Sequence, residues 1–143
     1  MKAAMARGFL PVFLLTCALA AEAPQPLVVV NSNNPVTTLT RAQLKKLLTG
    51  AQAKWPSGEK VVLLTTPPGS AERSSALQAF CDMTEQQLNT DMIHASFVGE
   101  ERIRARIVPT GKSIVQAVQA TPGAIGFVGE ADITDQVRLV HVE

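Results

Sequence analysis

A strand–loop–helix pattern between residues 61 and 80 strongly limits how this chain can fold. Val61–Leu64 is a short run of apolar residues, which predicts a buried strand. The Pro-Pro-Gly sequence at 67–69 ends that strand, and Ser70 then offers a good N-cap for a helix that we expect to extend to Cys81. A turn from a buried strand into a helix presents backbone N–H groups to an anion. This stretch is therefore the first place to look for a ligand.

Strand and helix patterns alternate along the rest of the chain. The continuous apolar run at residues 27–30 predicts a central strand, and further strands are expected at 123–128, where small residues allow close packing, and at 137–142. The capping boxes Thr40-x-x-Gln43 and Thr84-x-x-Gln87 each predict the start of a helix, and a further helix should begin near Thr110. Alternating strands and helices are typical of a mainly parallel sheet with helices on both faces. We expect one such α/β domain over residues 21–143.

The first twenty residues have the features of a secretory signal peptide. Lys2 and Arg7 precede an apolar segment, Phe9–Leu19, which is too short to span a bilayer. Ala18-Leu19-Ala20 is an A-x-A cleavage site, so we expect residues 1–20 to be removed near Ala20 and the protein to be periplasmic. Two alternatives rank lower: an uncleaved membrane anchor, and a lipoprotein attached through Cys17.

Charge and composition exclude several classes of partner. Removal of Lys2 and Arg7 changes the formal net charge from +1 to −1, which gives no electrostatic bias toward nucleic acid. Aromatic residues make up only 4% of the chain, too few for a base-stacking surface. After cleavage Cys81 is the one remaining cysteine, so no internal disulfide and no CxxC metal site is expected. We expect Cys81 to be a small buried residue.

Residues for catalysis are sparse. His94 falls in an apolar helical stretch and His141 alternates with valines, which favours structural or exposed roles for both. Gly111-Lys112-Ser113 is not a P-loop, because position 106, where that motif needs glycine, is arginine. No Gly-x-Ser-x-Gly elbow occurs. The sequence predicts a protein that is not an enzyme and that uses no metal or cofactor.

An alternating arginine pattern between residues 102 and 107 has two interpretations. If the segment is a strand, Arg102, Arg104 and Arg106 share one face. They then form either an anion site or, more often, the charged outer face of an edge strand.

Three segments carry a family resemblance. Leu39–Trp55 is similar to an "LT…IFLGKI..W" stretch, Gly69-Ser70 after the Val61–Leu64 strand is similar to a Gly-Ser-Gly-Thr ligand loop, and Thr121–Val128 is similar to a "PGAIGYV" ending. All three belong, in this order, to the periplasmic phosphate-binding proteins of phosphate ABC transporters. The chain from residue 27 to 143 resembles a short, single-lobe relative of that family.

This resemblance implies an exported lobe of the type II periplasmic binding-protein class that binds phosphate or a similar small oxyanion for transport. It makes Ser70 the ligand-binding serine, and we expect Gly69, Ala71 and Arg73 to lie beside the ligand. The chain departs from the family at Thr66, where arginine is expected, and at Ala71-Glu72, where Gly-Thr is expected.

A single lobe also leaves half of such a site open to solvent. The resemblance therefore implies a partner, either an ABC permease or a second lobe or copy that closes the site. The alternative function is a periplasmic interaction or sensory module that kept the fold and lost the ligand. Thr66 and Glu72 favour this alternative, whereas the helix starts at Ser70 and Gly111 favour oxyanion binding.

Overall fold

The computed structural model describes residues 25–143. The expected signal peptide, its cleavage near Ala20 and the lipidation alternative at Cys17 all lie outside this range. The elements in chain order are β1 (Leu27–Asn31), β2 (Thr38–Leu39), α1 (Arg41–Leu48), β3 (Val62–Thr65), α2 (Ala71–Ala76), the π-helical turn η1 (Leu77–Cys81), α3 (Glu85–Phe97), β4 (Arg106–Ile107), α4 (Gly111–Ala120), β5 (Ala124–Val128), the 3-10 turn η2 (Glu130–Asp132) and β6 (Val137–Val142).

The strands form one six-stranded sheet in the order β2-β6-β1-β5-β3-β4. Pairings β2–β6, β3–β5 and β3–β4 are parallel, so the sheet is mainly parallel as predicted. The exception is β1, which runs antiparallel to both β5 and β6. Its apolar run predicts burial on both faces but carries no information on strand direction.

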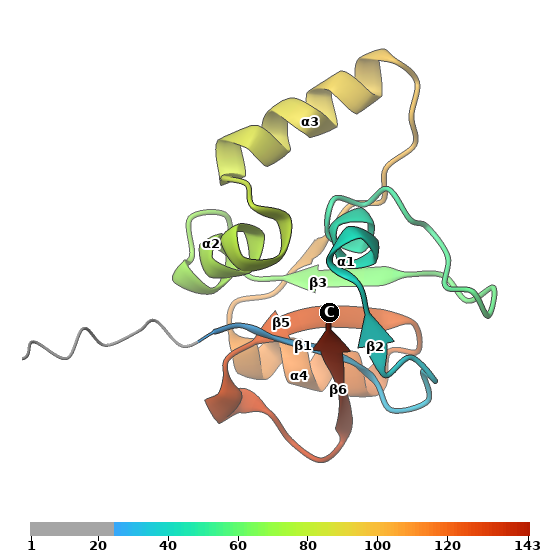
Figure 1. The fold of residues 1–143 in the computed structure, drawn as a ribbon. Helices are drawn as coiled ribbons and strands as arrows, with labels where there is room; N and C mark the ends of the chain where they lie inside the picture. Colours follow the sequence, from blue (N-terminus) through green and yellow to red (C-terminus); the bar gives the residue numbers. More distant parts are fainter. Residues whose placement is uncertain (1–24) are drawn as a thin grey trace, which may run out of the picture.

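Helices cover both faces of the sheet, which confirms the predicted α/β architecture (Figure 1). Val28 and Val30 of β1 point into the core beneath α1 and α2, whereas Val29 points into the core beneath α4. This alternation follows from the period of two along a strand. Gly126 of β5 allows α4 to approach closely, because a Cβ there would lie 2.5 Å from Cγ2 of Ile114. The small residue of β5 thus permits close packing of α4 on the sheet.

Both predicted capping boxes are present at helix starts. The backbone N of Gln43 donates to Oγ1 of Thr40 at 3.2 Å, and Oε1 of Gln43 accepts from the backbone N of Thr40 at 2.9 Å. Thr84 and Gln87 make the same pair of contacts at the start of α3. In the described part, residues 25–143, no helix has the length and apolar character to cross a bilayer.

The helix expected from Ser70 to Cys81 forms, but its second half is a π-helical turn. Asp82, in the left-handed conformation with φ of 50°, ends it. Cys81 is only 4% exposed and Phe80 packs against Phe127 with ring centroids 5.6 Å apart. Cys81 is thus a buried structural residue, as predicted.

Cys81 is expected to resist thiol reagents while the protein is folded. Burial raises the pKa of its thiol from 9.0 to about 11, against a smaller lowering effect of the Lys45 charge. Because the folded-state pKa lies above the unfolded value, the neutral thiol contributes stability that is present below about pH 9 and lost as pH rises through about 11. Maleimide labelling followed by mass spectrometry at neutral pH should therefore require urea. Rapid labelling in native buffer would contradict this packing of α2 and η1.

The arginine-alternating segment is not one strand. Only Arg106–Ile107 pairs with the sheet, as the edge strand β4. Arg102 is instead drawn toward α3 and the end of α1, where it contacts Asp91 and the backbone oxygen of Thr49. The expected common face of three arginines is therefore wrong for residues 102–105, because these ion-pair and backbone contacts replace strand pairing.

Candidate functional site

The β3–α2 loop places two hydroxyl groups beside a helix start. Oγ1 of Thr66, which is 2% exposed, lies 2.6 Å from Oγ of Ser70. Ser70 is the N-cap of α2, and its Oγ also accepts from the backbone N of Arg73 at 3.4 Å. Gly69 adopts φ of 84°, a left-handed conformation that favours glycine and reverses the chain tightly before Ser70. The loop is thus a compact turn that presents one serine at the end of a helix.

A second helix start lies at the same edge of the sheet. Strands β3, β4 and β5 are parallel, so their carboxyl ends share one edge, and α2 and α4 both begin there (Figure 1). The backbone N of Val108 donates to the oxygen of Thr65 at 2.9 Å, which ties the two loops together. Thr110 caps α4 through the backbone N of Ser113 at 3.2 Å. Gly69, Ser70 and Gly111 therefore lie at one edge of the sheet.

A carboxylate approaches the start of α4. A Cβ added to Gly111 would lie 2.4 Å from Oδ2 of Asp132, so the side chain of Asp132 lies directly against this glycine. A negative charge at a helix N-terminus stabilises the helix and repels a second anion. The start of α4 is therefore a poor anion site. The first turn of α2 also carries a carboxylate, that of Glu72, which is exposed. The sequence pattern did not indicate this contact, because Asp132 follows Gly111 by 21 positions and has no motif of its own.

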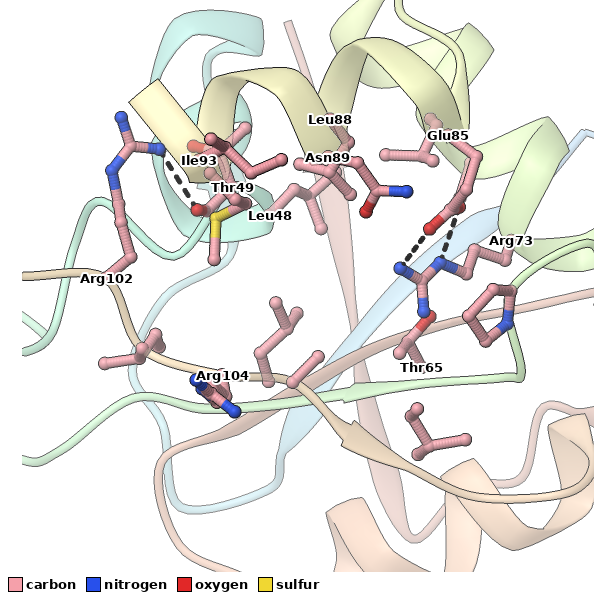
Figure 2. A pocket seen from close by; sticks show the side chains of 18 of the residues that line it. Leu48, Thr49, Thr65, Arg73, Glu85, Leu88, Asn89, Ile93, Arg102 and Arg104 are labelled. Atoms are coloured by element: carbon pink, nitrogen blue, oxygen red, sulfur yellow. Dashed lines mark hydrogen bonds and ion pairs between the residues drawn. The ribbon is translucent and has the colours of Figure 1, made fainter. Parts of the chain in front are cut away.

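Arg73 points away from the Ser70 hydroxyl and toward α3. Its Nε donates to Oε2 of Glu85 at 2.8 Å and its Nη2 donates to Oε1, which makes a two-pronged ion pair (Figure 2). Both side chains are mostly buried, with 14% and 24% of their surface exposed. Ala71 and Glu72 lie exposed on the first turn of α2. The sequence indicated Arg73 as a charged residue near the loop but gave no signal for its partner Glu85.

A cavity of about 720 Å³ lies between α3 and the β3–β4 edge of the sheet. We call it the α3 cavity. Arg73 and Glu85 lie at one end and Arg102 at the other (Figure 2). Ser70 does not line it. Its lining residues are Leu48, Thr49, Leu63, Thr65, Pro68, Arg73, Ala76, Leu77, Glu85, Leu88, Asn89, Met92, Ile93, Ser96, Gly99, Glu100, Arg102, Ile103, Arg104, Ala105, Ile107 and Phe127.

Arg102 binds the middle of α3 and the segment that follows this helix. Its guanidinium lies 3.0 Å from Oδ2 of Asp91 and 3.0 Å from Oε2 of Glu100. The hydrogen bonds that Arg102 donates to Glu100, and to a smaller extent to Asp91, raise the pKa of its guanidinium, whereas burial lowers it. Arg102 is therefore a structural cation rather than a free anion ligand. Within residues 25–143, no group of three or more His, Cys, Asp or Glu side chains is placed to hold a metal ion.

Comparison with known proteins confirms the resemblance at the level of fold. No protein-family model matches the chain, and the search of curated proteins gives no match. Solved structures of phosphate ABC transporter substrate-binding proteins do match, and the chain has their periplasmic-binding-protein-like α/β fold.

Three of these structures illustrate the likeness. One is assigned as a phosphate ABC transporter substrate-binding protein with bound phosphate from Clostridium perfringens, at 24% identity and a TM-score of 0.66, covering 83% of this chain and 45% of that one. An ABC-type phosphate transport receptor from Vibrio cholerae has 21% identity and a TM-score of 0.67, and the match covers 83% of this chain and 46% of the receptor. PstS from Borrelia burgdorferi has 16% identity and a TM-score of 0.66, and the match covers 84% of this chain and 47% of PstS. This chain thus spans just under half the length of each.

Proposed function

We propose that this protein is an exported solute-binding domain that binds phosphate or a similar small oxyanion in connection with ABC transport, and that it is not an enzyme. The observation that carries the proposal is the compact turn of Thr66, Gly69 and Ser70 at the start of α2, in a fold that is shared with phosphate-binding transport proteins. We further propose that residues 1–20 are a signal peptide and that the folded domain is periplasmic.

The hydrogen bonds around Ser70 support a donor role for its hydroxyl. Its Oγ accepts from the backbone N of Arg73, and it can accept from Oγ1 of Thr66. When Thr66 is the donor of this pair, both lone pairs of the Ser70 hydroxyl are engaged and its own proton is left to donate to an oxyanion. The unpaired N–H groups of the first turn of α2, at Ala71 and Glu72, add donors and a favourable helix dipole. In this arrangement Gly69 allows close approach of the ligand, whereas the charge of Arg73 is paired with Glu85.

The exposure of this loop supports a role for a partner. Ser70 is partly exposed and Ala71 fully so, whereas small-molecule sites usually bury most of their ligand. The match covers only 45% and 46% of two of the transport proteins, so more than half of each has no counterpart in the matched region. We propose that an ABC permease, a second lobe or a second copy of this chain closes the site.

Calorimetric titration with phosphate, with sulfate as a control, tests this function. The chain from Ala21, which contains every described residue, should show saturable phosphate binding. Ser70→Asp should abolish binding, because aspartate keeps the helix cap but repels the anion. Ser70→Ala should weaken binding by about tenfold or more, the effect of losing a hydrogen bond to a charged group. Ser74→Ala, an exposed serine of the same helix, is the matched control and should bind normally.

If the unaltered chain gives no heat of binding at millimolar phosphate, oxyanion binding is contradicted. The alternative function, an interaction or sensory module without a ligand, would then be favoured. If Ser70→Ala and Ser74→Ala weaken phosphate binding equally, the phosphate site does not lie at this loop. N-terminal sequencing of the protein recovered from the periplasm of an expression host tests the signal peptide, and a first residue other than Ala21 would contradict cleavage after Ala20.

A further inference from the structure

The α3 cavity is a space that the chain does not fill with its own side chains. Only Leu88 and Ala95 of the thirteen residues of α3 are buried. Figure 1 shows this helix lying apart from the sheet. Ile93 and Phe97 of this helix are 59% and 87% exposed. Apolar contact of α3 with the core is therefore limited, with Leu88 in the core cluster and Met92 packed against it.

Two ion pairs attach α3 to the rest of the protein. Glu85 binds Arg73 of α2 at the start of the helix, and Asp91 binds Arg102 near its middle. The cavity lies between these two attachments (Figure 2). Its volume of about 720 Å³ is within the usual range of small-molecule sites, roughly 300–1,000 Å³.

The walls of the cavity are mainly apolar. Leu63, Leu77 and Phe127 line the side of the sheet and α2, Leu88 and Met92 line the side of α3, and Ile103 lines the connecting segment. Apolar side chains around a void lack van der Waals partners on that side. An apolar ligand of suitable length would supply these partners, whereas a bare phosphate would lose its hydration there without replacement.

The charges that line the cavity favour a single negative charge on the ligand. Three arginines and two glutamates line it. Arg73 is paired with Glu85, and Arg102 with both Glu100 and Asp91, whereas Arg104 makes no ion pair within residues 25–143. Arg104 is exposed on the connecting segment, across the space from α3 (Figure 2). Arg104 is thus the lining arginine that remains available to pair with a ligand carboxylate.

We propose that the α3 cavity binds an amphipathic monoanion, a molecule with an apolar chain and one carboxylate, as a site separate from the Ser70 loop. The apolar chain of the ligand lies among Leu63, Leu77 and Met92, and the carboxylate of the ligand pairs with Arg104. The proposal does not depend on phosphate binding, because Ser70 does not line the cavity.

Titration with dodecanoate below its micelle concentration tests this site. The chain from Ala21 should bind one dodecanoate saturably. Dodecyltrimethylammonium, which has the same apolar chain and the opposite charge, should not bind, and inorganic phosphate should not compete. Arg104→Glu should weaken dodecanoate binding about tenfold through charge reversal. Arg106→Glu, an exposed arginine two positions away that does not line the cavity, should bind as the unaltered chain does.

A space-filling variant and a vesicle assay complete the test. Ala105→Phe should abolish dodecanoate binding while phosphate binding is retained. No saturable binding by the unaltered chain would overturn the proposal, as would equal weakening by Arg104→Glu and Arg106→Glu. The protein should not co-sediment with vesicles of phosphatidylcholine and phosphatidylglycerol. Co-sedimentation that depends on Arg104 would instead identify this rim as a membrane-docking surface and would also overturn the proposal.

Discussion

Replacing Gly123 with alanine should lower the free energy of unfolding by about 3 kcal/mol, through a left-handed backbone and a steric clash. Gly123 has φ of 77°, and a Cβ there would lie 2.1 Å from the backbone oxygen of Lys60. Backbone cannot yield as a flexible side chain can, so the segment before β5 must move away from the segment before β3. The melting temperature should fall by about 10 °C, as measured by circular dichroism.

Gly58→Ala is the matched control for that variant. Gly58 also has a left-handed backbone, with φ of 90°, but nothing lies within 4 Å of an added Cβ. Gly58→Ala should lower the free energy of unfolding by only about 1 kcal/mol, which is the cost of the left-handed backbone alone. Equal destabilisation by the two variants would show that the approach of Gly123 to Lys60 is looser than in the structure described here.

Trp55→Ala is expected to destabilise the protein by about 3–5 kcal/mol, the usual cost of removing a large buried aromatic side chain. Trp55 is 3% exposed, and its Nε1 donates to the backbone oxygen of Gly123 at 2.8 Å. The side chain therefore joins the loop after α1 to the turn that starts β5. Urea unfolding followed by far-ultraviolet circular dichroism measures the loss, since the variant has no tryptophan for fluorescence.

Trp55→Phe separates packing from hydrogen bonding at the same position. It keeps an aromatic ring but leaves the Gly123 oxygen with only the backbone N of Val62, at 3.0 Å. The expected cost is about 1–2 kcal/mol, that of a lost buried hydrogen bond. If Trp55→Phe were as damaging as Trp55→Ala, packing of the ring would not be the main contribution.

The features that the sequence predicted correctly are those set by neighbouring residues. The capping boxes at Thr40 and Thr84 depend on contacts three positions apart, and the N-cap at Ser70 is equally local. The apolar runs predicted buried strands because burial on both faces requires them. The alternation of strands and helices then predicted the mainly parallel sheet and its two helical layers.

The features that the sequence did not predict depend on contacts between distant residues. The direction of β1 is set by pairing with β5 and β6, about a hundred positions later. The ion pairs Arg73–Glu85 and Arg102–Asp91, which hold α3, follow no motif. For this reason the sequence pointed to Ser70 and Arg73 but not to Asp132 beside Gly111, nor to the α3 cavity.

The central position of β1 has a consequence for the order of folding. β1 is among the first residues of the described chain, yet its two neighbours in the sheet are the last two strands. Contacts with such large sequence separation form late, because closing a long loop is entropically costly. The sheet can therefore be completed only after β6 has been synthesised. If the chain is exported as we propose, its central strand can find both of its neighbours only after β6 has crossed the membrane as well.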